Sequence, residues 1–210
     1  MLKNGAQTLA VLACWLGLSG PGLVMAQEAP DAFMQRLSND MLETIKKDPA
    51  LKAGDLQKIA ALVDISLVEH INFKRMTASA VGPAWRQASP EQQKRLIEEF
   101  KWLLMRTYSG ALSQIKDNHT ILVKPLRTSN TDTEVLIRSE LRGGKEPINI
   151  DYRLEKTADN ASGWRIYNFN LLGVWLVDNY RSQFAQEINT KGVDGLIASL
   201  AERNQASKRK

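Results

Sequence analysis

The sequence is poor in the residues that most catalytic and metal sites require. It holds one cysteine, Cys14, and two histidines, His70 and His119. Cys14 lies in an apolar stretch that we expect to be removed, so the mature protein should hold no disulfide and no cysteine-ligated metal. The HExxH, GxSxG and P-loop patterns are absent. The sequence therefore predicts no metal, no cofactor and no catalytic residue.

Long hydrophobic runs are also scarce. Beyond the first 26 residues, no segment reaches the roughly 18 uninterrupted apolar residues that a transmembrane helix needs. The start of the chain combines Lys3, the apolar run Leu9–Leu18 and the small-residue site Val24-Met25-Ala26, which is typical of a secretory signal peptide. We expect residues 1–26 to be cleaved after Ala26; a weaker alternative is a lipoprotein anchored at Cys14.

An exported protein meets little nucleic acid, so the net charge of +5 does not predict a nucleic-acid partner. We expect one domain over residues 27–203, followed by a basic disordered tail at 204–210. The hydrophobic content of 43% suffices for a sizeable core in a chain of this length.

The first half of the mature chain shows helical periodicity. Asp31 is placed to cap a first helix that ends at Asp48-Pro49, and further helices are expected over Leu56–Glu69 and Phe73–Ala80. Ser89-Pro90-Glu91-Gln92 is a capping box with proline at its first helical position. The long helix that it begins should reach Lys116.

The pattern then changes to alternation, which predicts strands. The loops between the alternating segments are too short for crossover helices, so the strands should form an antiparallel meander. Two C-terminal helices should follow, and Leu171–Val177 is so apolar that it should be buried on both faces or line something apolar. The expected segments are strands at Ile121–Arg127, Thr133–Leu141, Ile148–Lys156 and Trp164–Leu172, and helices at Asp178–Ile188 and Val193–Arg203.

This order predicts an α+β fold in which N-terminal helices and one long helix pack on a four-stranded antiparallel meander. The apolar positions on the sheet and long helix form either a solid core or a lined cavity, and periodicity cannot separate the two. If they line a cavity, the candidate lining residues are Trp85, Leu104, Tyr108, Leu112, Val135, Ile137, Ile150, Tyr152, Ile166, Val174, Trp175 and Leu176.

Four segments resemble the MlaC family of periplasmic phospholipid-binding proteins, also called toluene-tolerance auxiliary proteins. They read GxxWRxxSxxQ at 82–92, FxxxLxRTYxxxL at 100–112, WRIY at 164–167 and GVxLVxNYRSQF at 173–184. The resemblance extends from about Leu56 to Leu200. Three positions depart from the family pattern: Asn72 and Asn168 stand where aspartate is common, and Trp175 where a small residue is usual.

The resemblance implies a soluble periplasmic phospholipid carrier with an apolar lipid pocket. Such a carrier would shuttle lipid between an outer-membrane lipoprotein complex and an inner-membrane ABC transporter with an MCE-type ring, and so maintain outer-membrane lipid asymmetry. Docking on both complexes favours exposed basic residues. The candidates are Lys74, Arg75 and Arg86, then Lys94, Arg95 and Lys101, and last Arg181.

Two other classes remain open. One is an enzyme, a small α+β hydrolase or isomerase that acts on an apolar substrate near His70 or His119. The other is an envelope chaperone or peptide-binding module. Phospholipid that co-purifies with the protein would separate the carrier from both.

Overall fold

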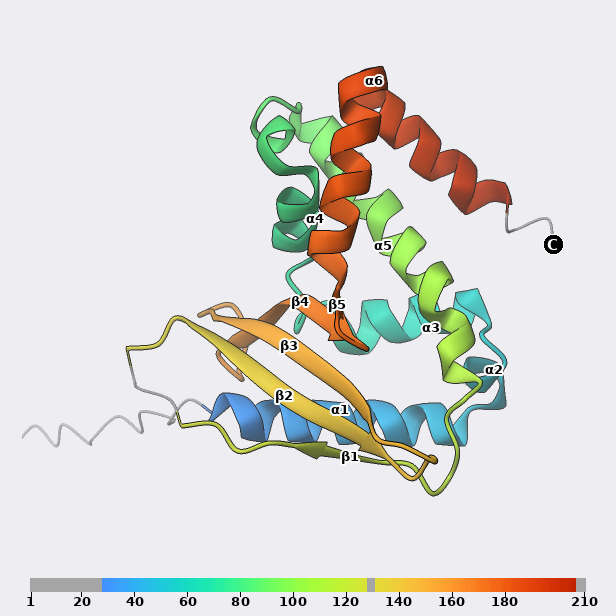
Figure 1. Ribbon diagram of the computed structural model, residues 1–210, viewed down its shortest axis with the longest axis vertical. Helices are drawn as coiled ribbons and strands as arrows, with labels where there is room; N and C mark the ends of the chain where they lie inside the picture. Colours follow the sequence, from blue (N-terminus) through green and yellow to red (C-terminus); the bar gives the residue numbers. More distant parts are fainter. Residues whose placement is uncertain (1–27, 128–130, 207–210) are drawn as a thin grey trace, which may run out of the picture.

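A computed structural model describes residues 28–127 and 131–206 (Figure 1). The sheet and α1 form one end of the molecule, α4, α5 and α6 form the other, and α3 lies between them. The helices are α1 (Pro30–Lys47), α2 (Pro49–Lys52), α3 (Leu56–Leu62), η1 (Val63–Leu67), α4 (Phe73–Val81), η2 (Gly82–Arg86), α5 (Pro90–Leu112) and α6 (Leu176–Ala206), and the strands are β1 (Thr120–Val123), β2 (Glu134–Arg142), β3 (Ile148–Lys156), β4 (Trp164–Leu171) and β5 (Val174–Trp175).

The sheet confirms the predicted α+β class and the antiparallel meander. Its strand order is β1-β2-β3-β4-β5, with every neighbouring pair antiparallel. The fifth strand was not predicted. It forms because Leu172 and Gly173 adopt positive φ angles of 54° and 87°, which reverse the chain after β4. The expectation that this run is buried on both faces is wrong for Leu172 and Val174, which are 75% and 48% exposed.

The two faces of the sheet differ in chemistry. One face carries Ile137, Tyr152, Leu154 and Ile166, all buried, and α1 lies along it through Phe33, Met34 and Leu37. We call this the apolar face. The other, the polar face, carries charged residues of β2, β3 and β4 and receives the start of α6. Alternation along each strand separates the two sets.

The helical end is packed around aromatic rings. Phe100 of α5 lies 5.1 Å from the ring of Tyr180 and 5.2 Å from that of Phe184, both edge to face. The predicted capping box is confirmed, because the Ser89 hydroxyl accepts from the Gln92 amide N–H while the Gln92 side chain accepts from the Ser89 N–H. α5 ends at Leu112, four residues before the expected Lys116.

The N-terminal region corrects one expectation and confirms another. α1 begins at Pro30 with Ala29 at the N-cap, and the predicted cap Asp31 lies inside the helix. Its carboxylate accepts from the Leu126 N–H at 3.2 Å. The predicted end of this helix at Asp48-Pro49 is confirmed, because α1 ends at Lys47 with Asp48 as its C-cap. The Asp48 carboxylate also accepts from the N–H groups of Ala50 and Leu51 and so caps the short helix α2.

Both edges of the sheet are occupied by groups from other elements. At β1, the Gln35 amide donates to the Ile121 carbonyl at 3.0 Å and accepts from the Val123 N–H at 2.8 Å. At β4, the Ile166 N–H donates to the His70 carbonyl at 2.8 Å, and Ile166 accepts from the Asn72 N–H at 2.8 Å. β5 pairs with the same edge further along.

The C-terminal part of the chain differs from the expected tail. The two predicted helices form one element, α6, which bends at Gly192, where φ is 71°. The helix continues past Arg203 to Ala206. Asn204 is buried, and its side-chain amide donates to the Glu99 carboxylate at 2.7 Å. The remainder of the predicted tail, 207–210, and the predicted signal peptide lie outside the described residues.

Candidate functional site

The hydrophobic core falls into two clusters. The main cluster joins the apolar face of the sheet to α1, α4, α5 and α6. The second holds Leu51, Ile59, Ala60, Val63 and Met105, from α2, α3, η1 and α5. α5 therefore contributes to both, with the neighbouring Leu104 in the main cluster and Met105 in the second.

The boundary between the clusters is lined by half-buried apolar side chains. Leu67 and Phe73 pack against both clusters, Tyr108 against the main one and Leu112 against the second. We call these four residues the seam. Solid cores bury such side chains fully, because close packing leaves few gaps inside a protein. Their partial exposure leaves apolar surface from both clusters within reach of solvent along the seam.

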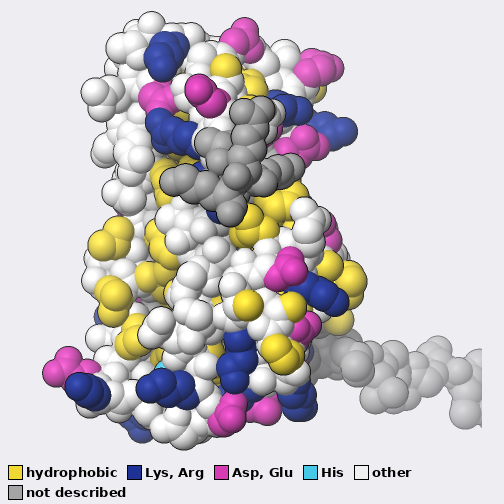
Figure 2. All heavy atoms as spheres, turned by 90° about the vertical axis from the view of Figure 1, so that its right-hand side faces the viewer, with side chains coloured by type: hydrophobic (Ala, Val, Ile, Leu, Met, Phe, Trp, Pro, Cys, Tyr) yellow, Lys and Arg dark blue, Asp and Glu magenta, His cyan; other side chains and the backbone are white. Residues whose placement is uncertain are grey.

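Exposed apolar residues continue from the neighbouring elements. Ile65 and Val68, in and after the π-helical turn η1, are 79% and 48% exposed. Figure 2 views the molecule from the right-hand side of Figure 1. On that face, hydrophobic side chains gather over the middle, and charged groups are more frequent toward the two ends. A π-helical turn inside a helix is often found at functional sites.

Most predicted lining residues do come together. Val135, Ile137, Ile150, Tyr152 and Ile166 share the apolar face, and Trp85, Leu104, Tyr108 and Leu176 pack in the same main cluster. Their burial is uneven: Ile137 and Ile166 are almost fully enclosed, whereas Val135 and Ile150 are half-buried. The half-buried members are the ones that a ligand could reach without unfolding the core.

Tyr108 has a polar partner inside this region. Burial raises the pKa of its hydroxyl to about 12, and its hydrogen bond with Tyr180 adds to the effect. The seam is therefore uncharged at neutral pH, which suits an apolar ligand.

Trp175 lies elsewhere. It is opposite Asn170 in the β4–β5 pair, on the polar face, and its ring is 4.1 Å from the Arg153 guanidinium carbon. Arg153 also lies 3.5 Å from the Asp178 carboxylate. The Trp175 ring is thus stacked on Arg153 on the polar face, whereas Tyr152 lies on the opposite, apolar face. Trp175 therefore does not narrow the space around the seam. Asn168, another departure from the family pattern, is buried and accepts from the Val177 N–H at 3.1 Å.

Arg75 is held inside a polar network that we call the brace. Its guanidinium pairs with the carboxylates of Glu134 and Glu155 and lies 3.6 Å from the centre of the Tyr167 ring. Burial disfavours the charge of Arg75, but the hydrogen bonds to Glu155 and Glu134 outweigh it and raise the pKa. Asn72 joins the brace by donating to Glu155.

The other predicted docking cations divide into two groups. Lys74, Arg86 and Lys94 are exposed. The rest have partners within the chain: Arg95 with Glu99 at 3.0 Å, Lys101 with Asp64 at 2.8 Å, and Arg181 with the Ser79 carbonyl at 2.8 Å. The brace likewise removes Arg75 from the set of exposed basic residues, so the expectation that it is a free surface cation is wrong.

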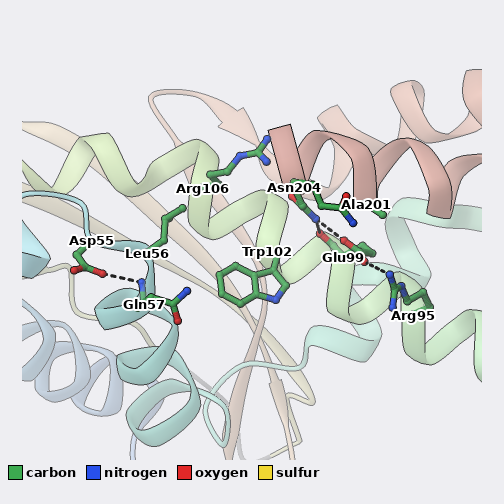
Figure 3. Close-up of a pocket in the computed structure, with 10 residues that line it drawn as sticks. Asp55, Leu56, Gln57, Arg95, Glu99, Trp102, Arg106, Ala201 and Asn204 are labelled. Carbon is green, nitrogen blue, oxygen red and sulfur yellow. Dashed lines mark hydrogen bonds and ion pairs between the residues drawn. The ribbon is translucent and has the colours of Figure 1, made fainter. Parts of the chain in front are cut away.

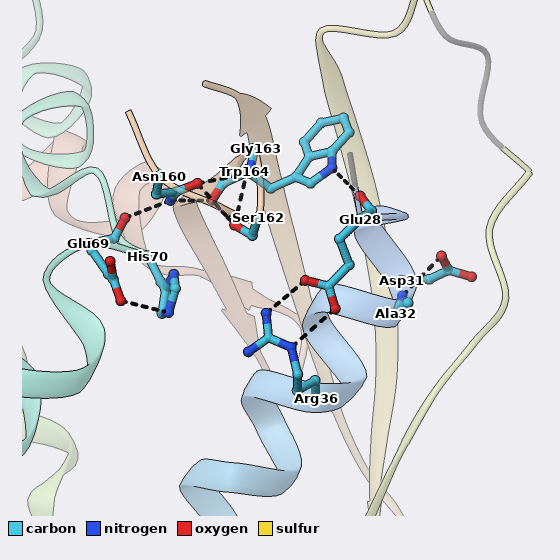
Figure 4. Close-up of polar contacts among 10 residues, drawn as sticks. All are labelled: Glu28, Asp31, Ala32, Arg36, Glu69, His70, Asn160, Ser162, Gly163 and Trp164. Atoms are coloured by element: carbon cyan, nitrogen blue, oxygen red, sulfur yellow. Dashed lines mark hydrogen bonds and ion pairs between the residues drawn. The ribbon is translucent and has the colours of Figure 1, made fainter. Parts of the chain in front are cut away.

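The two histidines have structural surroundings. His70 Nε2 lies 3.4 Å from the carboxylate of its neighbour Glu69 (Figure 4). The His70 ring also packs edge to face on Phe33. Burial lowers its pKa. His119 is buried, and its Nδ1 accepts from the Lys116 N–H at 3.3 Å. Across residues 28–127 and 131–206, no group of three histidine, cysteine or acidic residues is placed to hold a metal ion.

A mixed groove of about 490 Å³ lies apart from the sheet, between the start of α3, the middle of α5 and the end of α6 (Figure 3). Arg95, Glu99, Trp102 and Arg106 line it from α5. No helix in the described part of the chain is both long and apolar enough to cross a membrane.

Sequence reasoning missed Leu67, Phe73 and the groove. Periodicity placed Leu67 among the apolar positions of the predicted helix Leu56–Glu69, and Phe73 begins the next predicted helix. Neither pattern indicates that the two side chains meet at one boundary. The groove combines residues from three elements that are far apart in the sequence.

The protein thus combines an α+β fold, built on an antiparallel sheet, with a seam of half-buried apolar side chains that suits an apolar ligand. The family model described as MlaC protein matches residues 35–202. The chain therefore belongs to the MlaC family, as its four sequence segments indicated.

Three relatives show how close the similarity is. The chain is 21% identical over 181 residues to "Intermembrane phospholipid transport system binding protein MlaC" of Haemophilus influenzae, covering 85% of this chain and 83% of that protein. It is 28% identical over 195 residues to "Toluene tolerance protein ttg2D" of Pseudomonas putida, covering 89% and 88%. The structure matches that of a phospholipid-binding protein from Ralstonia solanacearum, in complex with a phospholipid, with a TM-score of 0.77 and 44% identity, covering 84% of this chain and 97% of that one.

Proposed function

We propose that this protein is a soluble periplasmic phospholipid carrier without catalytic activity. The observation that carries the proposal is the similarity to the Ralstonia solanacearum protein, which covers nearly all of that chain and whose structure contains a phospholipid. The name of the Haemophilus influenzae relative agrees with phospholipid transport. The acyl chains would enter at the seam and lie against the apolar face of the sheet.

The physical properties of the seam support this assignment. Leu67, Phe73 and Leu112 offer apolar surface without charge, and Tyr108 stays protonated at neutral pH. Two acyl chains of about 30 methylenes would gain roughly 24 kcal/mol relative to water, which exceeds practical noncovalent affinity. The relevant reference is therefore a bilayer, from which transfer into an apolar site is nearly neutral. The phosphate group would stay outside, because burying an unpaired charge is costly.

A pair of matched substitutions tests the ligand and its location. Ile150 is half-buried on the apolar face, and Leu136 is 36% exposed on the polar face, on the neighbouring strand. Ile150→Asp should strongly reduce the phospholipid that co-purifies with the protein, since the new carboxylate would meet the acyl chains. Leu136→Asp should leave it unchanged.

The measurement is native mass spectrometry of protein purified without added lipid, with circular dichroism to verify folding. Absence of phospholipid from the wild type would remove the carrier proposal. Equal lipid content in both folded variants would place the chains away from Ile150.

The proposed route requires export and two membrane partners. Residues 1–26 would act as the signal peptide, and the partners would be an outer-membrane lipoprotein complex and an inner-membrane ABC transporter with an MCE-type ring, in a pathway that maintains outer-membrane lipid asymmetry. Of the basic residues considered for docking, Lys74, Arg86 and Lys94 are exposed and could meet acidic surfaces on these partners.

A further inference from the structure

The mixed groove contains a cation whose role the proposed carrier function does not explain. Arg106 belongs to the family-like segment 100–112, yet its side chain lies in the groove, away from the apolar stripe of α5. Its guanidinium donates to the carbonyl of Arg203 near the end of α6. In the described part of the chain it has no carboxylate within ion-pair distance. A guanidinium in a groove with only a neutral acceptor keeps its capacity for an anion.

The two acidic residues of the groove are both engaged. The Asp55 carboxylate accepts from the N–H groups of Gln57 and Lys58 and caps α3. Glu99 is buried, and its two oxygens are used by Arg95 at 3.0 Å and by the Asn204 amide at 2.7 Å. The two arginines and two acidic residues of the lining balance in formal charge, but Arg106 makes no ion pair with either carboxylate, so its positive charge is the one that a ligand can meet.

The rest of the lining suits a peptide. Trp102 and Leu56 supply an aromatic and apolar floor, and Gln57, Asn204 and Gln205 place amide groups around it. Side-chain amides can both donate to and accept from a peptide backbone. The volume of about 490 Å³ falls within the range of roughly 300–1,000 Å³ found for specific ligand pockets.

We propose that this groove binds an acidic peptide segment of a protein partner, with a carboxylate on Arg106 and an adjacent large apolar side chain on Trp102. This docking site is separate from the lipid site. It also lies on a different side of the helical end from the segment between α4 and α5 that carries Arg86 (Figure 1). A carrier with two such surfaces could engage two partners by different contacts.

The test is an NMR titration of the full mature chain with the blocked peptide Ac-Asp-Phe-Asp-Leu-NH2 at up to about 10 mM, since a single anchor of this kind gives millimolar affinity. Shifts should be confined to residues 55–57, 95–106 and 201–205. Arg106→Gln should weaken binding about tenfold, the typical loss of one charge-assisted hydrogen bond. Arg106→Lys should retain most of it, and Arg86→Gln should have no effect.

The control ligands decide between chemistries. The neutral peptide Ac-Asn-Phe-Asn-Leu-NH2 should bind much more weakly. Equal binding of the two peptides, equal shifts with inorganic phosphate, or no groove shifts with the acidic peptide would each overturn the proposal. Arg106→Gln and the wild type should contain the same amount of co-purified phospholipid. The peptide titration therefore tests only the groove, and the phospholipid content tests only the carrier proposal.

Discussion

The brace yields a prediction that separates a structural role of Arg75 from a docking role. Arg75→Met keeps most of the alkyl stem but removes the charge, so Glu155, whose side chain is 18% exposed, loses its cation. A hydrogen bond between charged groups contributes about 1.5–3 kcal/mol. The pair with Glu134 counts for little, because that carboxylate is 51% exposed and screened by solvent. The contact with the Tyr167 ring adds about 0.5–1 kcal/mol.

Asn72 still donates to Glu155 in the variant and offsets part of the loss. We therefore expect Arg75→Met to lower the free energy of unfolding by about 2 kcal/mol, which corresponds to a fall in Tm of about 4–8 °C for a domain of this size. Thermal unfolding followed by circular dichroism at pH 7 measures it. Lys74→Met, at the adjacent exposed position, is the matched control and should change Tm by less than about 1 °C.

The same network predicts how the difference depends on pH. Hydrogen bonds from Arg75 and Tyr167 lower the pKa of Glu134 in the folded state. Its contribution to stability is therefore present above the unfolded pKa of 4.5 and is lost as pH falls through the lower folded value. The small part of the Tm difference between wild type and Arg75→Met that comes from Glu134 should therefore disappear toward about pH 3. If Arg75→Met and Lys74→Met have the same Tm at pH 7, the brace does not stabilise the fold. Arg75 would then be a docking candidate again.

Two further predictions concern His70 and the exposed cations. Burial lowers the folded-state pKa of His70 below its ordinary value of 6.5. Between the folded and unfolded pKa values the unfolded chain therefore binds more protons than the folded protein, and the free energy of unfolding should fall as pH drops below about 6.5. Tm measured between pH 7.5 and 5 should decline less steeply in His70→Gln than in the wild type, and identical slopes would contradict the assignment. Replacing Lys74 and Arg86 together by Glu should slow association with at least one purified membrane complex and weaken its salt dependence, with bound phospholipid unchanged. Unaltered association rates at low and high salt for both complexes would place the docking surface elsewhere.

Sequence periodicity predicted the fold well where one local rule acts alone. The Ser89–Gln92 capping box needs only neighbouring residues, and the alternation in Ile148–Lys156 assigns side chains to two faces. Prediction failed where distant groups compete. Asp31 could cap a helix, but it lies within α1 and bonds to Leu126, which is 95 residues away.

The candidate site was predictable only in part for the same reason. A buried strand position is evident from alternation, so Ile137, Tyr152 and Ile166 were assigned to one face. Whether that face meets a solid core depends on how α3 and η1 pack against α5, which no local pattern encodes. Trp175 shows the limit most clearly. Its face is set by the unexpected reversal at Leu172-Gly173, so a residue expected in the pocket stacks on Arg153 instead.

The closure of both sheet edges limits how other chains can attach. An open edge strand invites pairing with a second chain, which underlies both aggregation and recognition by strand addition. Here the side chain of Gln35 occupies the hydrogen-bonding groups of Ile121 and Val123, and the segment around Ile71 does the same for β4. Partners are thus directed to side-chain surfaces, where contacts can form and dissociate without exchanging backbone hydrogen bonds. A carrier of the proposed kind, which would release each partner in turn, would gain quick separation from this arrangement, together with protection against self-association through its strands.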